Sequence, residues 1–71
     1  MDKAFLRKLG KQLRSFRIAA NLSQEDLAEL SGLHRNYIGG IERGERNPTI
    51  TSLRKLSKAL RISLSKLLEG L

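Results

Sequence analysis

The stretch between Ser23 and Arg43 carries the residue spacing that most constrains how this chain can fold. Ala28 lies four residues before Gly32, and Ile38 and Ile41 follow that glycine after six and nine residues. Two short helices that cross steeply need a small residue at their contact, a glycine at the corner and aliphatic side chains that fix the second helix on the first. Because these requirements are met in order, the sequence predicts two packed helices within residues 23–43.

The ends of these two helices are also marked in the sequence. Ser23 and Asp26 have the spacing of a capping box at the start of a helix over about 24–30, and Gly32 suits the positive φ of a tight turn. A further helix is predicted over about 35–43. It ends at Gly44, before a loop at Asn47 and Pro48.

Apolar residues recur at steps of three and four on both sides of this pair, which is the pattern of amphipathic helices. The first such stripe predicts a helix over about 3–20, with Asn21 as a left-handed stop, and consists of Leu6, Leu9, Leu13 and Phe16. After a predicted cap at Thr49, a second stripe consists of Ile50, Leu53, Leu56, Ala59 and Leu60. Ser63 begins a short fifth helix that ends at Gly70. The sequence therefore predicts an all-α, compact five-helix fold in a single domain over residues 1–71.

The length and composition exclude several classes of function. Seventy-one residues allow one modest core, and the chain contains no cysteine and only one histidine, His34. Disulfides, thiolate metal sites and histidine-based zinc sites are thus excluded, and no phosphate-binding loop or catalytic constellation is present. We expect no enzyme activity, no metal and no cofactor.

The charge of the chain favours a polyanionic partner. Lysine and arginine total 14 against 7 acidic residues, a formal net charge of +7. Such an excess points first to nucleic acid and second to an anionic membrane surface, with solubility alone as the remaining explanation. No apolar run approaches the roughly 20 residues of a membrane helix, and no secretory signal is recognisable, so we expect a cytoplasmic protein.

The stretch LSQEDLAELSGLHRNYIGGIERGERNPT, residues 22–49, resembles a known family. It is similar to the helix-turn-helix domain of phage repressors, Cro proteins and regulators of the xenobiotic-response-element type, and the resemblance extends over about residues 8–69. The most similar subgroup is the controller proteins of restriction-modification systems. This resemblance implies a lambda-repressor-like DNA-binding domain with its helix-turn-helix in the second and third helices.

In this family the third helix enters the major groove of DNA. With Ile38 and Ile41 defining the inner side, the resemblance implies that the bases are contacted by Arg35, Asn36, Gly39, Gly40 and Arg43. Arginine can pair with guanine and asparagine with adenine through two hydrogen bonds each, although Arg35 could also be a solvated cation. The paired glycines would let the backbone sit deep in the groove with no side chains in the way.

A second group of residues is expected to contact phosphates and so to position the protein without selecting sequence. It consists of Arg17, Ser23, Gln24, His34, Tyr37, Arg46 and Asn47. His34 could instead cap a helix, Tyr37 could simply pack, and Arg46 with Asn47 could shape the turn. The family also implies a partly buried ion pair between Arg17 and Glu42, which would hold the first helix against the third.

Binding to an inverted repeat requires two copies, so we expect a homodimer. Its interface is predicted in residues 60–71, from Leu60, Leu64, Leu67, Leu68 and Leu71, although Leu71 could be a frayed terminus. Contact with RNA polymerase would involve the acidic residues Glu25, Asp26 and Glu29. The alternative is an antitoxin-like or phage-repressor-like module whose main partner is another protein. An RNA-binding function has the charge but few exposed aromatic residues for stacking. We expect no membrane partner and no small-molecule ligand.

Overall fold

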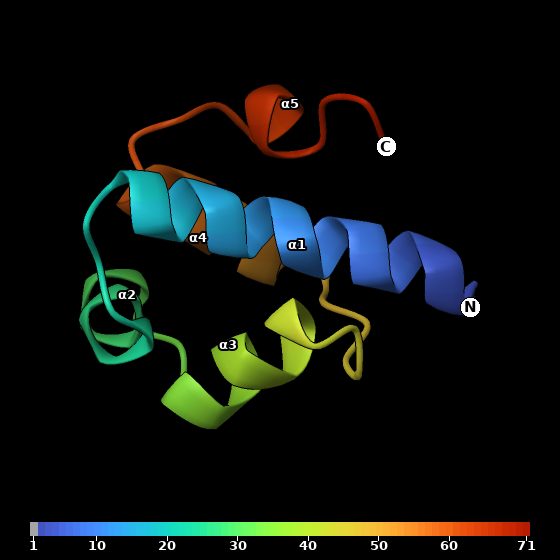
Figure 1. Cartoon of the computed structure of the whole chain (residues 1–71). Coiled ribbons are helices and arrows are strands. Elements are labelled where there is room, and N and C mark those ends of the chain that lie inside the picture. The colour runs from blue at the N-terminus through green and yellow to red at the C-terminus, as the bar shows by residue number, and fades with distance from the viewer. Residues whose placement is uncertain (1) are drawn as a thin grey trace.

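The computed structural model describes residues 2–71, which form five helices and no strand. The helices are α1 (Lys3–Ala19), α2 (Gln24–Ser31), α3 (Arg35–Glu42), α4 (Ile50–Ala59) and α5 (Leu64–Leu67). In Figure 1, α1 crosses the molecule with α2 and α3 on one side of it, α5 on the opposite side and α4 behind. The predicted all-α, five-helix architecture is confirmed, and the ends of the first three helices differ from prediction by one residue.

The predicted signals at both ends of α2 are confirmed. The Asp26 amide donates to the Ser23 hydroxyl at 2.9 Å, and the Ser23 amide donates to the Asp26 carboxylate at 2.9 Å. Because this amide hydrogen bond favours the ionised form, the pKa of Asp26 is held below its ordinary value. Asn21 adopts the left-handed φ of 59° before the helix, and Gly32 adopts a φ of 75° after it.

The core lies where α1, α2, α3 and α4 meet. Its buried apolar side chains are Leu9, Leu13, Leu27, Ile38, Ile41, Leu53, Leu56, Leu60 and Leu67. Ile38 and Ile41 are fully buried, which confirms the inner side of α3. None of the helices within residues 2–71 is long and apolar enough to cross a membrane.

Three leucine and isoleucine predictions need correction. Ile50 is 63% exposed instead of facing the core. It lies at the first position of α4, about 90° around the helix from the centre of the buried stripe. Leu60 and Leu67 are buried within this chain, so they are not available for an interface with a second copy. The reason is that α5 folds back onto α1 and α4 and places Leu67 in the shared core.

A close approach between α1 and α3 depends on Gly10, which the sequence analysis did not single out. A side-chain carbon added at Gly10 would lie 2.5 Å from the Glu42 carbonyl oxygen and also against the Ile41 carbonyl. The end of α3 therefore rests on the bare backbone of α1. This contact fixes the distance between α1 and α3 near Glu42, the last residue of α3.

Replacing Gly10 with alanine is expected to destabilise the fold by about 1 to 3 kcal/mol because the two backbones are forced apart. At an ordinary helix position the same change would stabilise by about 1 kcal/mol. Urea unfolding measures the free energy, with Arg14→Ala on the exposed side of α1 as the control. A Gly10→Ala protein as stable as the parent would show that this contact can relax.

Candidate nucleic-acid interface

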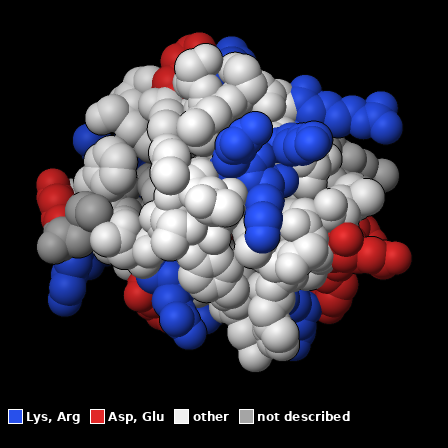
Figure 2. All heavy atoms as spheres, turned by 180° about the vertical axis from the view of Figure 1, so that it is seen from behind, with Lys and Arg blue, Asp and Glu red and all other residues white. Residues whose placement is uncertain are grey.

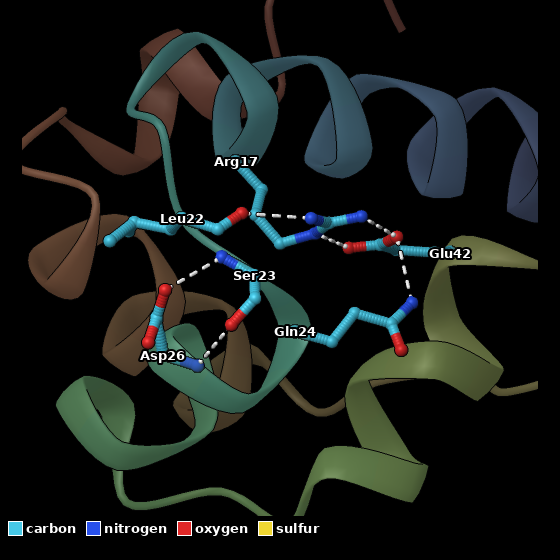
Figure 3. A network of polar contacts seen from close by, with 6 residues as sticks. All are labelled: Arg17, Leu22, Ser23, Gln24, Asp26 and Glu42. Atoms are coloured by element: carbon cyan, nitrogen blue, oxygen red, sulfur yellow. Dashed lines mark hydrogen bonds and ion pairs between the residues drawn. The ribbon is translucent and has the colours of Figure 1, made fainter.

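An ion pair between α1 and α3 underlies the surface formed by α3 and the start of α2 (Figure 3). Arg17 Nε lies 2.6 Å from Glu42 Oε2, and Arg17 Nη2 donates to Glu42 Oε1 at 2.9 Å. The two side chains are only 11% and 4% exposed. The predicted Arg17–Glu42 pair is therefore present, bidentate and buried.

Two more hydrogen bonds extend this pair into a network that joins four parts of the chain. Arg17 Nη1 donates to the Leu22 carbonyl oxygen at 2.9 Å, and Gln24 Nε2 donates to Glu42 Oε1 at 3.1 Å. Figure 3 shows the guanidinium between Leu22 and the Glu42 carboxylate, with Gln24 reaching the same carboxylate from α2. The network thus ties α1, the turn after it, the start of α2 and the end of α3 together.

The electrostatics of the pair keep Arg17 charged. Its hydrogen bond to Glu42 raises the pKa of Arg17, and this effect exceeds the opposing effect of burial. Three of the five N–H groups of a guanidinium are used within the chain, which leaves two for any external acceptor. The observed role of Arg17 is to hold the helices together.

The outward side of α3 presents three polar side chains to solvent. Arg35 Nη1 lies 3.4 Å from Glu25 Oε2, and Arg43 Nε lies 3.1 Å from Glu45 Oε1, with all four side chains more than half exposed. Exposed pairs of this kind are worth about 1 kcal/mol or less. Asn36 is exposed, and its side chain makes no hydrogen bond to any described residue. Arg35, Asn36 and Arg43 can therefore exchange their present surroundings for a ligand at little cost.

The surroundings of Gly39 and Gly40 in α3 differ from those expected from the sequence. Both are buried, because neighbouring side chains lie over them. A side-chain carbon at Gly39 would lie 3.0 Å from Arg43 Nη1 and 3.4 Å from Gln24 Oε1, and one at Gly40 would lie 2.6 Å from Arg46 Cγ. The expectation of an open backbone is thus wrong: the space left by the missing side chains is filled by the side chains of Gln24, Arg43 and Arg46.

The Arg46 side chain passes over Gly40 and reaches the ring of Tyr37. Its guanidinium carbon lies 5.9 Å from the ring centroid, within the range of a cation–π contact. The Tyr37 hydroxyl donates to Ser52 Oγ at 3.3 Å, and Thr49 Oγ1 donates to the same oxygen at 3.0 Å. The packing role considered for Tyr37 is therefore observed, and the loop between α3 and α4 is fastened to both helices.

Several other residues of the predicted phosphate group lie at helix starts or in this loop. His34 Nδ1 accepts from the Asn36 amide at 3.0 Å, so the capping role considered for His34 is confirmed. The Ser23 hydroxyl caps α2, as described above. Arg46 and Asn47 are exposed in the loop after α3. The part of the chain that the structure describes holds no cluster of three or more residues that could bind a metal.

Removing Glu42 leaves the Arg17 charge buried without a partner. We expect Glu42→Ala to lower the free energy of unfolding by about 3 to 5 kcal/mol. Glu45→Ala removes the acid of the exposed pair with Arg43 and is expected to cost about 0.5 kcal/mol. Urea unfolding of both variants checks this difference. Equal, small effects would mean that the Arg17–Glu42 pair contributes no more than a surface pair.

The contact of Arg46 with Tyr37 is expected to depend on Gly40. In Gly40→Ala the added methyl group meets the Arg46 stem, so the guanidinium should leave the ring, whereas Gly39→Ala should leave it in place. Protons of Arg46 above an aromatic ring carry an upfield NMR shift, and Tyr37 is the only tyrosine of the chain. Loss of that shift is predicted in Gly40→Ala alone; its survival there would contradict the contact.

The sequence of this chain is similar to those of several known proteins. A family profile described as helix-turn-helix matches residues 13–67. The chain is 58% identical over 60 residues to Control protein C.SmaI of Serratia marcescens, covering 84% of this chain and 71% of that protein. It is 44% identical over 61 residues to Control protein C.BamHI of Bacillus amyloliquefaciens, with 84% and 75% covered.

A solved structure gives the same picture. The restriction-modification controller protein C.AhdI from Aeromonas hydrophila superposes with a TM-score of 0.89 at 52% identity, covering 90% of this chain and 97% of that one. The region that matches the family profile contains α2, α3 and both partners of the Arg17–Glu42 pair.

Proposed function

The chain belongs to the helix-turn-helix family of DNA-binding transcription regulators, and we propose that it binds operator inverted repeats as a homodimer and controls restriction-modification genes. The observation that carries this proposal is the outward side of α3. It presents Arg35, Asn36 and Arg43 to solvent, while the buried pair of Arg17 and Glu42 fixes the helix from behind.

Sequence selection would come from the first turn of α3. Arg35 would donate two hydrogen bonds to guanine in place of its contact with Glu25, and Asn36 would pair with adenine through its amide. Each such contact is worth about 1 to 3 kcal/mol of discrimination. Arg43 would act further along the helix, where Gly39 leaves room for its side chain to lie close to the α3 backbone. Gly39 and Gly40 contribute through the side chains that cover them.

Backbone contacts would orient α3 in the groove. The starts of α2 and α3 provide amide groups and the positive ends of helix dipoles, which favour phosphate. Ser23, Gln24 and His34 lie at these starts. Arg46, which lies over the ring of Tyr37, and the exposed Asn47 would extend the contact along the DNA strand. The remaining N–H groups of Arg17 would reach a phosphate.

The dimer interface we propose is smaller than the sequence suggested. Leu60 and Leu67 belong to the core, which leaves the partly buried Leu64 and Leu68 and the exposed Leu71. Ile50, exposed at the start of α4, adds a further apolar side chain. Binding to an inverted repeat requires a two-fold axis that places two copies of α3 about 34 Å apart, one helical turn of DNA.

Activation would require a contact with RNA polymerase in the bacterial cytoplasm. Glu25, Asp26 and Glu29 are exposed along α2 and form the acidic surface for that contact. Glu25 also faces Arg35, so polymerase contact and base contact would lie next to each other on the molecule.

Selection from a random duplex library followed by fluorescence anisotropy tests the proposal. We expect an inverted repeat to be selected, with at least tenfold weaker binding to a scrambled duplex and to single-stranded RNA. Arg35→Ala and Asn36→Ala should each lose about 1 to 3 kcal/mol of discrimination at one base position per half-site.

Lys58→Ala, on α4 and outside the proposed DNA interface, serves as the matched control and should preserve specificity. Equal affinity for all three nucleic acids would contradict the proposal. It would favour the antitoxin-like alternative, in which another protein is the main partner.

A further inference from the structure

A groove lies between the end of α2 and the second half of α4, at the end of α2 opposite to Gln24. It has a volume of about 320 Å³ and is lined by Leu30, Ser31, Lys55, Lys58, Ala59 and Arg61. None of these residues has a role in the DNA interface proposed above. The groove is therefore a separate feature of the surface.

The rim of the groove is strongly basic. Among the described residues, no carboxylate lies within ion-pair distance of Lys55, Lys58 or Arg61. A neighbouring hollow on α4 adds Thr51 and Arg54 to the same two lysines. Figure 2 shows basic side chains gathered near the centre of the face seen from behind. Within residues 2–71 none of the three rim cations is paired, although Glu29 is exposed on α2 next to Leu30.

The floor of the groove is apolar. Leu30 is 60% exposed although its side chain borders three cations, and Ala59 lies half-buried beside it. A single exposed leucine on a surface is unremarkable by itself. An exposed leucine inside a concave site with a cationic rim is complementary to a ligand that carries both an apolar group and negative charge.

The backbone at Arg61 gives an independent indication. Arg61 follows the end of α4 with a left-handed φ of 59°, a position where glycine is usual. A residue with a side chain is disfavoured there by roughly 1 kcal/mol, and such strain concentrates at functional positions. Within residues 2–71 the other case is Asn21, a residue type that tolerates this conformation. Arg61 thus carries a side chain at a position where glycine would fit without strain.

We propose that this groove docks an acidic segment of a partner protein. One large apolar side chain of that segment packs against Leu30, while its carboxylates pair with Lys55, Lys58 and Arg61 on the rim. Nucleic acid fits less well, because a phosphate backbone has nothing to place against the apolar floor. The proposal does not depend on the proposed DNA-binding function.

Selection of displayed random 12-residue peptides that bind the full chain tests this docking proposal. Selection should enrich peptides that combine several Asp or Glu residues with a large apolar residue, and a synthetic copy should shift the amide NMR signals of Leu30, Ser31 and Arg61. Its affinity should fall at least tenfold in Leu30→Ser, in Lys58→Glu and in Arg61→Gly. Glycine suits the left-handed φ, so Arg61→Gly should melt no lower than the parent.

Ile18→Ser, which removes a 54% exposed apolar residue from α1, is the matched control and should bind the peptide unchanged. All these variants should retain the parent's affinity for the selected DNA. Failure of the docking proposal can therefore be distinguished from failure of the proposed DNA-binding function. The proposal is overturned if no groove-dependent peptide is enriched, or if single-stranded RNA shifts the same signals more strongly. It is also overturned if Leu30→Ser changes the sedimentation of the free protein, which would show that a second copy covers the groove.

Discussion

The buried pair of Arg17 and Glu42 is the interaction on which the arrangement of this molecule depends. Moving two charges out of water costs several kcal/mol for each ion, so such a pair is tolerated only when its geometry is good and its remaining polar atoms are satisfied. Here two direct hydrogen bonds, the Leu22 carbonyl and the Gln24 amide meet that requirement. An apolar pair could hold the helices together, but it would not fix Gln24 beside α3.

Glycine has a second, connected role in the same region. Gly10 lets α1 lie directly on the carbonyl groups at the end of α3, close to the carboxylate that Arg17 binds. Gly39 and Gly40 then allow long side chains to lie flat on the opposite side of α3. Close contacts can thus form on both sides of α3, where Arg43 lies against Gly39 and Arg46 lies against Gly40 and the ring of Tyr37. Glycine has a low helix propensity, and at these three positions that cost is offset by close packing.

Local signals in the sequence were sufficient for the helices and for most of their ends, although α5 ends at Leu67 and not at the predicted Gly70. Periodic leucines, the Ser23–Asp26 box and Gly32 act within a few residues, so their outcome did not depend on the rest of the fold. The Arg17–Glu42 pair joins residues 25 positions apart and came only from family resemblance. Ile50, Leu67 and Gly40 were misjudged because their burial depends on how helices pack, which a helical wheel does not contain. Gly10 had no local signal at all.

The most direct test of the account is to map, by amide NMR, where a duplex selected from a random library touches the protein. We predict large shifts at Gln24, Arg35 and Asn36 and in the loop at Arg46, with one copy of the protein on each half of an inverted repeat. Leu30 and Lys58, which lie outside the proposed DNA interface, should stay unshifted. Shifts concentrated along α4, with α3 unaffected, would contradict the assignment of α3 as the recognition helix.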